Sequence, residues 1–255
     1  MIRVWAIALN TFREAVRDKV LYSLLFFALL MIGGSVLVAE LTIGEYERIL
    51  RDVGLAAINI FGLVIAVFVG IGLIYKEIER KTIYTIASKP VFRWQFLLGK
   101  YLGLLATLGT EVVIMAFALL ATLAATGAST NAAVGAALWL TFVELAVVTA
   151  VATLFGCFTS PMLAALFTVG VTIIGKLSQD LATLGRAAES PLVAKAAALA
   201  YAVFPDLGRF DVRSSASYGT PISWEYVAYA TGYGAAYAAA ALVLAALIFR
   251  FRDFK

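Results

Sequence analysis

Residues 73–100 read LIYKEIERKTIYTIASKPVFRWQFLLGK and form a short polar bridge between two long apolar runs. The run before the bridge, 54–75, and the run after it, 96–125, are each long enough to cross a bilayer as a helix. Six of the chain's twenty Lys and Arg residues lie in this stretch, together with only two Glu. A short loop this basic is typical of the cytoplasmic side of a membrane protein. We therefore assign 76–95 to a cytoplasmic loop.

The middle of this loop predicts a two-turn helix over 82–88, which Pro90 ends. Its apolar side chains share one face at helical spacing, namely Ile83, Ile86 and Ala87. Two interpretations fit this pattern. The loop is either a basic turn resting on lipid headgroups, with Trp94 as an interfacial anchor, or a helix that docks on a soluble partner. The pattern alone does not choose between them.

The composition is that of an integral membrane protein, because 63% of the residues are apolar and 14% are charged. The net charge of +4 calls for no nucleic-acid partner, since the positive charge gathers beside the apolar runs. One cysteine, Cys157, excludes an internal disulfide, and the lack of histidine excludes a histidine-based metal site or catalytic base. The length leaves no room for a separate catalytic domain, so we expect a single membrane domain that is not an enzyme.

An all-α membrane fold with six spans follows from the apolar runs. The spans are expected at about 20–39, 54–75, 96–125, 132–155, 162–176 and 226–249. Before them, residues 1–19 carry polar side chains on one stripe and apolar side chains on the opposite one. This pattern predicts a helix lying in the membrane interface.

The charge distribution predicts the orientation. The N-terminus, the bridge and the C-terminus together hold thirteen basic and five acidic residues. The two long loops on the other side, 40–53 and 178–225, hold more acidic than basic residues. By the positive-inside rule both termini are expected in the cytoplasm and 178–225 outside, which agrees with an even number of spans.

Small residues at helical spacing favour close packing between helices. They are Gly62, Gly70 and Gly72 in the second span and the pair Gly99-x-x-x-Gly103 in the third. The stretch 170–176, GVTIIGK, mimics a P-loop, but Leu177 stands where that motif requires Ser or Thr. Because the stretch also lies within an apolar run, we assign no nucleotide site to it.

Glu111 and Glu144 are the only acidic residues within the predicted spans. A charged side chain at the bilayer centre costs about 2.5–3.5 kcal/mol on insertion scales, so the pair needs an explanation. Counted from the turn at 127–131, both lie near the membrane midplane, and no Lys, Arg or His is expected at that depth. We therefore expect at least one neutral carboxyl, with hydrogen-bond partners among Asn59, Thr107, Thr110 and Thr141. Three roles remain: a hydrogen bond between helices, a polar lining of the transport path, or a proton relay.

Tyrosines form a stripe at helical spacing along the last span, at positions 226, 229, 233 and 237. Such a ladder is typical of packing or of an interfacial belt. The alternative is a ligand path, in which Tyr229, Tyr233 and Tyr237 would line the route together with Asn59.

Three stretches together resemble ABC exporter permeases. They are 7–20, IALNTFREAVRDKV; 76–90, KEIERKTIYTIASKP, followed by Arg93 and LLGK at 97–100; and 204–213, FPDLGRFDVR. The second stretch resembles the first cytoplasmic loop of these permeases. The nearest resemblance is to the subgroup linked to maturation of multi-copper enzymes such as nitrous-oxide reductase. The three stretches span the chain in the family's order.

The resemblance implies the transmembrane subunit of an exporter in the cytoplasmic, or inner, membrane. ATP and Mg would be bound by a separate ATPase subunit, and two permease copies, as a homodimer, would assemble with two ATPases among the membrane lipids. The short helix of the bridge would insert into the ATPase, and its tilt would move the attached spans. The coupling residues implied are Glu77, Glu79, Arg80, Ile83, Tyr84, Ile86 and Ala87, with a second contact at 156–161.

Two other functions remain open at this point. One is a proton-coupled secondary transporter that uses Glu111 and Glu144 without an ATPase. The other is a membrane scaffold that transports nothing. The sequence names neither the substrate nor the direction of transport, nor a periplasmic partner, nor whether the chain pairs with itself or with a related subunit.

Overall fold

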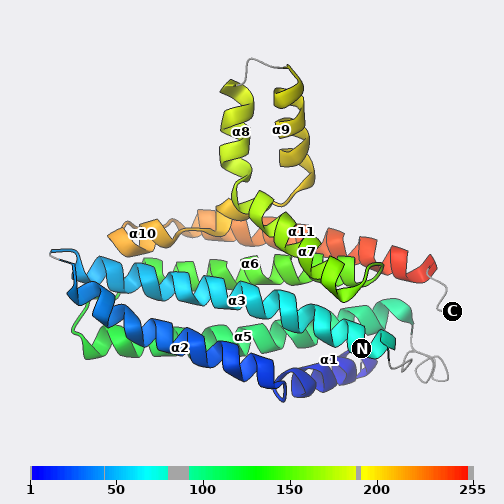
Figure 1. Ribbon diagram of the computed structural model, residues 1–255, viewed down its shortest axis with the longest axis horizontal. Coiled ribbons are helices and arrows are strands. Elements are labelled where there is room, and N and C mark those ends of the chain that lie inside the picture. The colour runs from blue at the N-terminus through cyan, green and yellow to red at the C-terminus, as the bar shows by residue number, and fades with distance from the viewer. Residues whose placement is uncertain (1, 43, 80–91, 188–190, 252–255) are drawn as a thin grey trace.

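The computed structural model describes residues 2–42, 44–79, 92–187 and 191–251, and within them every regular element is a helix. An elongated bundle of long helices lies side by side in Figure 1. Its long members are α2 (Lys19–Glu40), α3 (Tyr46–Glu79), α5 (Arg93–Ala125), α6 (Ala132–Gly156) and α11 (Trp224–Phe251). Each of the five contains a stretch long and apolar enough to cross a membrane. The predicted all-α membrane fold is confirmed.

The boundaries of these helices follow local signals. Asn131 caps α6, because its side-chain oxygen accepts a hydrogen bond of 3.0 Å from the backbone N–H of Val134. Pro161 begins α7 (Pro161–Lys176) as its first residue, with Ser160 at the cap position, because a proline fits the first turn of a helix. The expected loop over 40–53 is wrong in extent, because α3 already begins at Tyr46. Arg51 shows why: its guanidinium donates to the backbone oxygens of Ser129 and Ser217, so this turn of helix is held against the loop before α6 and against the short helix that contains Ser217.

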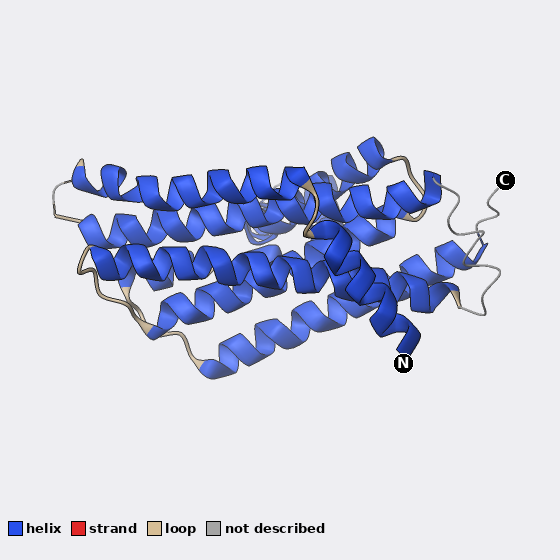
Figure 2. Ribbon diagram, turned by 90° about the horizontal axis from the view of Figure 1, so that it is seen from below, coloured by secondary structure: helices blue, strands red, loops and turns tan. Residues whose placement is uncertain are grey.

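The amphipathic N-terminal segment forms α1 (Ile2–Ala15), which crosses the bundle obliquely in Figure 2. It packs against α5 at the Gly99-x-x-x-Gly103 pair. A Cβ at Gly103 would lie 2.6 Å from the carbonyl oxygen of Ala8, and one at Gly99 would lie 2.7 Å from the Cβ of Ile7. The glycines therefore let the two backbones approach closely, and the predicted contact motif is confirmed.

The core of the bundle is apolar and centred on α3, α5 and α6. Its fully buried side chains include Ile58, Ile65, Met115, Leu119 and Leu140. Gly62 lies against α6, where an added Cβ would meet the Leu145 side chain at 2.7 Å. Large apolar side chains such as Phe26, Phe68 and Phe117 point outward and are exposed, as expected of a surface that faces lipid.

The predicted fifth span is short when α7 is taken alone. α7 has 16 residues and is therefore about 24 Å long, short of the roughly 30 Å of a hydrocarbon core. At its end the chain bends by 56° into α8 (Ser178–Ala187), so the count of spans is five, or six if this bent pair is one broken span.

The predicted external loop at 178–225 contains more helix than expected. α8 and α9 (Pro191–Val203) form a hairpin that projects away from the bundle in Figure 1. The chain then returns through the short 3-10 helix η1 (Leu207–Phe210) and α10 (Arg213–Tyr218) to the start of α11.

Candidate functional site

The end of α7 is fixed to the bundle by an ion pair whose carboxylate is buried. The Lys176 ammonium lies 2.8 Å from Oε1 of Glu144 on α6. It also donates a 2.8 Å hydrogen bond to the side-chain oxygen of Asn59 on α3, whose own NH₂ donates to Glu144 Oε2 at 2.7 Å. Three helices are thus joined by one closed triangle of polar side chains.

This triangle corrects the expectation that no basic residue lies near Glu144. The Glu144 carboxyl is 1% exposed, and breaking such a buried pair leaves an uncompensated charge. Lys176 also lies in the last turn of α7, where a helix dipole favours a cation. Of the partners predicted for the acids, Asn59 is confirmed for Glu144.

The bend between α7 and α8 is closed by Asp206, which is 3% exposed. Its carboxylate accepts hydrogen bonds from the Ser178 hydroxyl at 2.9 Å and from Arg209 Nε at 2.7 Å. Gly175 permits this approach, because a Cβ there would lie 2.6 Å from the carbonyl oxygen of Pro205. We call this contact of Gly175 and Ser178 with 205–209 the joint.

The tyrosine stripe of α11 holds the same returning segment. Tyr226 donates to the Arg209 backbone oxygen at 2.7 Å, and Tyr237 donates to the Val203 backbone oxygen at 3.1 Å. The Tyr233 hydroxyl accepts from the Asp206 backbone N–H, and the Tyr229 hydroxyl accepts from Arg209 Nη1. All four hydroxyls therefore contact residues 203–209, which favours the packing interpretation of the ladder.

A second ion pair stands beside the triangle. Arg213 donates from Nε and Nη2 to the two carboxylate oxygens of Asp211, at 2.8 and 2.5 Å. Partial burial raises the pKa of Asp211, but the hydrogen bonds and charge of Arg213 outweigh it and leave that pKa below its ordinary value. The Asp211 charge also acts on Lys176 and Glu144, so the two pairs form one electrostatic cluster.

A cleft of about 430 Å³ opens between α3 and α7 next to this cluster. Its walls are apolar, from α3 and α7, and include Leu63, Val67, Phe68 and Ile173. Its polar end is formed by Asn59, Lys176 and Arg213. We call it the α3–α7 cleft. A concave, mostly apolar site with a few convergent polar groups is the usual form of a small-molecule site.

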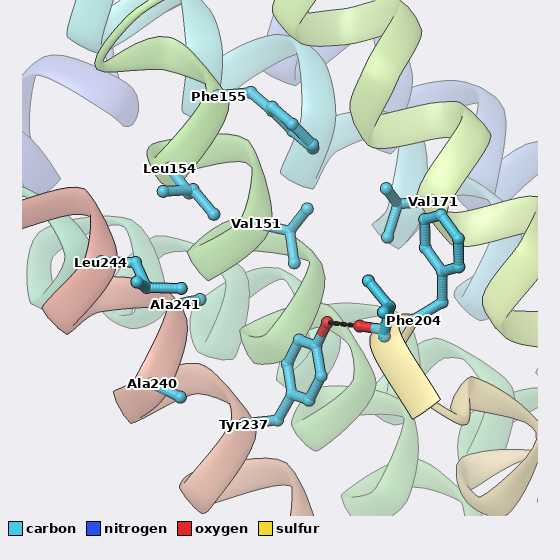
Figure 3. A pocket seen from close by; sticks show the side chains of 10 residues that line it. Val151, Leu154, Phe155, Val171, Phe204, Tyr237, Ala240, Ala241 and Leu244 are labelled. Carbon is cyan, nitrogen blue, oxygen red and sulfur yellow. Dashed lines mark hydrogen bonds between the residues drawn. The ribbon is translucent and has the colours of Figure 1, made fainter. Parts of the chain in front are cut away.

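A second cavity, of about 340 Å³, lies between α6, α7 and α11 and is shown in Figure 3. It is lined by apolar side chains such as Val151, Phe155, Val171 and Leu244. Its lining hydroxyl belongs to Tyr237, which is already bonded to the Val203 carbonyl. This cavity offers space for an apolar chain but no charged group, so the α3–α7 cleft has the richer chemistry.

A comparison with models of protein families identifies the family of this chain. The model of the family described as ABC-2 family transporter protein matches residues 5–183, more than half of the chain. The chain belongs to the ABC-2 transporter family. No curated protein matches the sequence. An ABC-2 chain with this fold is a multi-pass permease component of an ABC transporter.

The coupling residues expected of this ABC-2 permease fall largely outside the described residues. Glu77 and Glu79 lie in the last turns of α3. The other five, Arg80, Ile83, Tyr84, Ile86 and Ala87, lie in the range 80–91, which the structure does not describe. Their role stays a prediction.

Glu111 and Glu144 differ sharply in surroundings. Glu144 is paired with Lys176, whereas neither carboxyl oxygen of Glu111 has a hydrogen-bond partner among the described residues. Glu111 is nevertheless only 2% exposed. Thr107 and Thr110, predicted as partners, donate instead to carbonyls of their own helix, at Gly103 and Ala106.

Sequence reasoning missed the two basic residues that line the cleft, Lys176 and Arg213, and the joint residue Asp206. The sequence does single out Lys176, because it is a lone basic residue at the end of an apolar run. Pairing it with Glu144, 32 positions away, requires knowing that α7 stops short. Asp206 and Arg213 lie in the stretch 204–213 that carries the family resemblance.

Proposed function

We propose that this chain is the membrane subunit of an ATP-driven exporter, working as a pair of identical permeases with a separate ATPase subunit. Membership of the ABC-2 family supports the permease role. The observation that carries the transport site is the α3–α7 cleft, whose polar end is formed by Asn59, Lys176 and Arg213. Glu144, behind this end, holds Lys176 and Asn59 in place. ATP and Mg belong to the ATPase in this proposal.

The position of α3 supports a way of coupling ATP hydrolysis to the cleft. α3 is one continuous helix of 34 residues that ends at the cytoplasmic loop and carries Asn59 midway. A tilt of the loop on ATPase closure would move α3 as a rod. Since Lys176 is on α7 and Asn59 is on α3, such a movement changes the triangle and the width of the cleft together.

The finer assignments rest on the sequence. The three stretches at 7–20, 76–100 and 204–213 favour the subgroup linked to maturation of multi-copper enzymes.

The basic loop favours an orientation with both termini in the cytoplasm, and hence an inner-membrane protein. Single cysteines test this orientation: Ser88→Cys and Lys255→Cys should be labelled only from the cytoplasm, and Glu47→Cys and Ser215→Cys only from outside. Labelling of Ser88→Cys and Glu47→Cys from one side would overturn it. The native Cys157 is buried and gives little background.

The test of the function uses the loop. We expect the chain to co-purify with an ATPase and to stimulate ATP hydrolysis in vesicles. Ile83→Asp with Ile86→Asp should abolish both, because an apolar docking face provides roughly 1.5–3 kcal/mol per buried side chain. The matched control, Thr85→Asp with Ser88→Asp, adds the same charge on the opposite stripe and should keep both. Wild-type co-purification and stimulation in the Ile83→Asp/Ile86→Asp variant would rule out this docking face.

A further inference from the structure

The polar end of the α3–α7 cleft is lined by basic side chains and not by the carboxylates that pair with them. Lys176 and Arg213 line it, whereas their carboxylate partners, Glu144 and Asp211, do not. The Lys176 and Arg213 side chains are 28% and 30% exposed, Glu144 is 1% exposed, and Asp211 is 31% exposed but is not part of the cleft lining. The cleft therefore presents positive donors, although the cluster as a whole is close to neutral.

Both cations keep hydrogen-bonding capacity. An ammonium has three donors, and Lys176 uses two of them, toward Glu144 and Asn59. Arg213 uses Nε and Nη2 on Asp211, and Nη1 has no partner among the described residues. An anionic group placed between the two cations could accept from both without breaking either existing pair.

The walls of the cleft suit a hydrocarbon chain. Ile60, Phe68 and Ile173 line it and are 56%, 59% and 54% exposed, on helices that cross the membrane or enter it. The volume of about 430 Å³ lies within the range of small-molecule sites. A chain lying along these side chains would stay in an apolar environment over its whole length, as it does among the lipid tails.

We propose that the α3–α7 cleft binds an anionic amphiphile, with its carboxylate or phosphate between Lys176 and Arg213 and its acyl chain along α3 and α7. The guanidinium favours such an acceptor, since its donors are arranged to bond carboxylate or phosphate oxygens. A cationic amphiphile would face two like charges, and a neutral one would lose the charge-assisted bonds. This proposal deepens the proposed function by naming the ligand class of the same cleft.

The test measures binding without ATP or an ATPase, so that it is independent of transport. The full chain is placed in nanodiscs of neutral phosphatidylcholine, and binding of oleate, lysophosphatidic acid and oleyl alcohol is compared. The two acids should bind at least tenfold more tightly than the alcohol, as expected for a lost charge-assisted bond. Preference for oleate indicates a free fatty acid, and preference for the phosphate indicates a lipid headgroup.

Variants locate the site. Arg213→Gln should weaken binding of both acids about tenfold, and Arg213→Lys should restore most of it, because a cation returns. Leu63→Trp should block the chain in all three probes without touching a charge. Lys195→Gln on the exposed face of α9 removes a cation away from the cleft and should change nothing.

Equal binding of acid and alcohol, or unchanged binding in both Arg213→Gln and Leu63→Trp, would overturn the proposal. The proposed function fails separately, if the chain binds the acids but neither joins an ATPase nor transports.

Discussion

Lys176 Nζ lies 2.8 Å from Glu144 Oε1, and this contact ties the end of the short helix α7 to α6, one of the two most buried spans of the bundle. Through the same ammonium group, Lys176 of α7 also contacts Asn59 of α3, which is itself bonded to Glu144. The last carbonyls of a helix have no partner within the helix, so other groups must stabilise its end. Lys176 supplies a cation at that end, and its charge offsets that of Glu144, whose side chain is 1% exposed.

Removing one partner of this pair should be costly. Lys176→Met leaves the Glu144 charge buried and unpaired, and should lower the free energy of unfolding by about 3 kcal/mol. Glu144→Met together with Lys176→Met should recover most of this loss, because a matched apolar pair is close to neutral in stability. The four proteins of this double-mutant cycle can be compared by thermal unfolding in one detergent. A double variant no more stable than Lys176→Met would contradict the role of the pair.

The joint predicts a graded response. Asp206→Ala removes the acceptor of both Ser178 and Arg209 and should cost about 3 kcal/mol, since a bond to a charged group is worth roughly 1.5–3 kcal/mol. Ser178→Ala removes one neutral donor and should cost about 1 kcal/mol. Asp180→Ala, at an exposed position two residues further along α8, is the matched control and should stay within about 0.5 kcal/mol of the wild type. A larger loss of stability in Ser178→Ala than in Asp206→Ala would show that Asp206 does not close the bend.

The sequence was sufficient for the long helices and insufficient for the site. Apolar runs of 20 or more residues predict α2, α5, α6 and α11 closely, because crossing a membrane constrains length and composition strongly. The contact of Gly99 and Gly103 with α1 was also predictable, since small residues four apart allow backbones to approach.

The bend that follows α7 was not predictable in the same way. Composition alone reads 162–176 as a span, and only the tertiary contact of Gly175 with Pro205 shows that the chain turns there. From the sequence alone, Lys176 would be placed at the edge of the membrane, and Glu144 would have no basic partner. The pairing is a property of the topology and not of any local pattern.

Acid should weaken the part of the fold held by Asp211. Because Arg213 leaves the pKa of Asp211 below its ordinary value near 3.8, ionised Asp211 stabilises the folded state above that pH. This contribution is lost as the pH falls through the lower pKa of the folded state. We therefore expect the stability difference between the wild type and Asp211→Asn to be present at pH 5–7 and to disappear in stronger acid. Thermal unfolding of both proteins across this range measures it, and a difference that grows toward acid would have the wrong sign.

Glu111 allows stability and transport to be separated. Its carboxyl is 2% exposed, and neither oxygen has a hydrogen-bond partner among the described residues, so the native side chain carries an unmet desolvation cost. Glu111→Leu should therefore raise the free energy of unfolding by about 1–3 kcal/mol, and Glu111→Gln should change it less, because the amide keeps a polar end. If Glu111 is not a proton relay, both variants should retain ATP-driven transport in vesicles, with or without a proton gradient.

Glu144→Gln is the companion variant, which should keep transport but lose stability because Lys176 is left without its carboxylate. Loss of transport in Glu111→Gln and Glu144→Gln, together with dependence of the wild type on the gradient, would instead favour the proton-coupled secondary transporter.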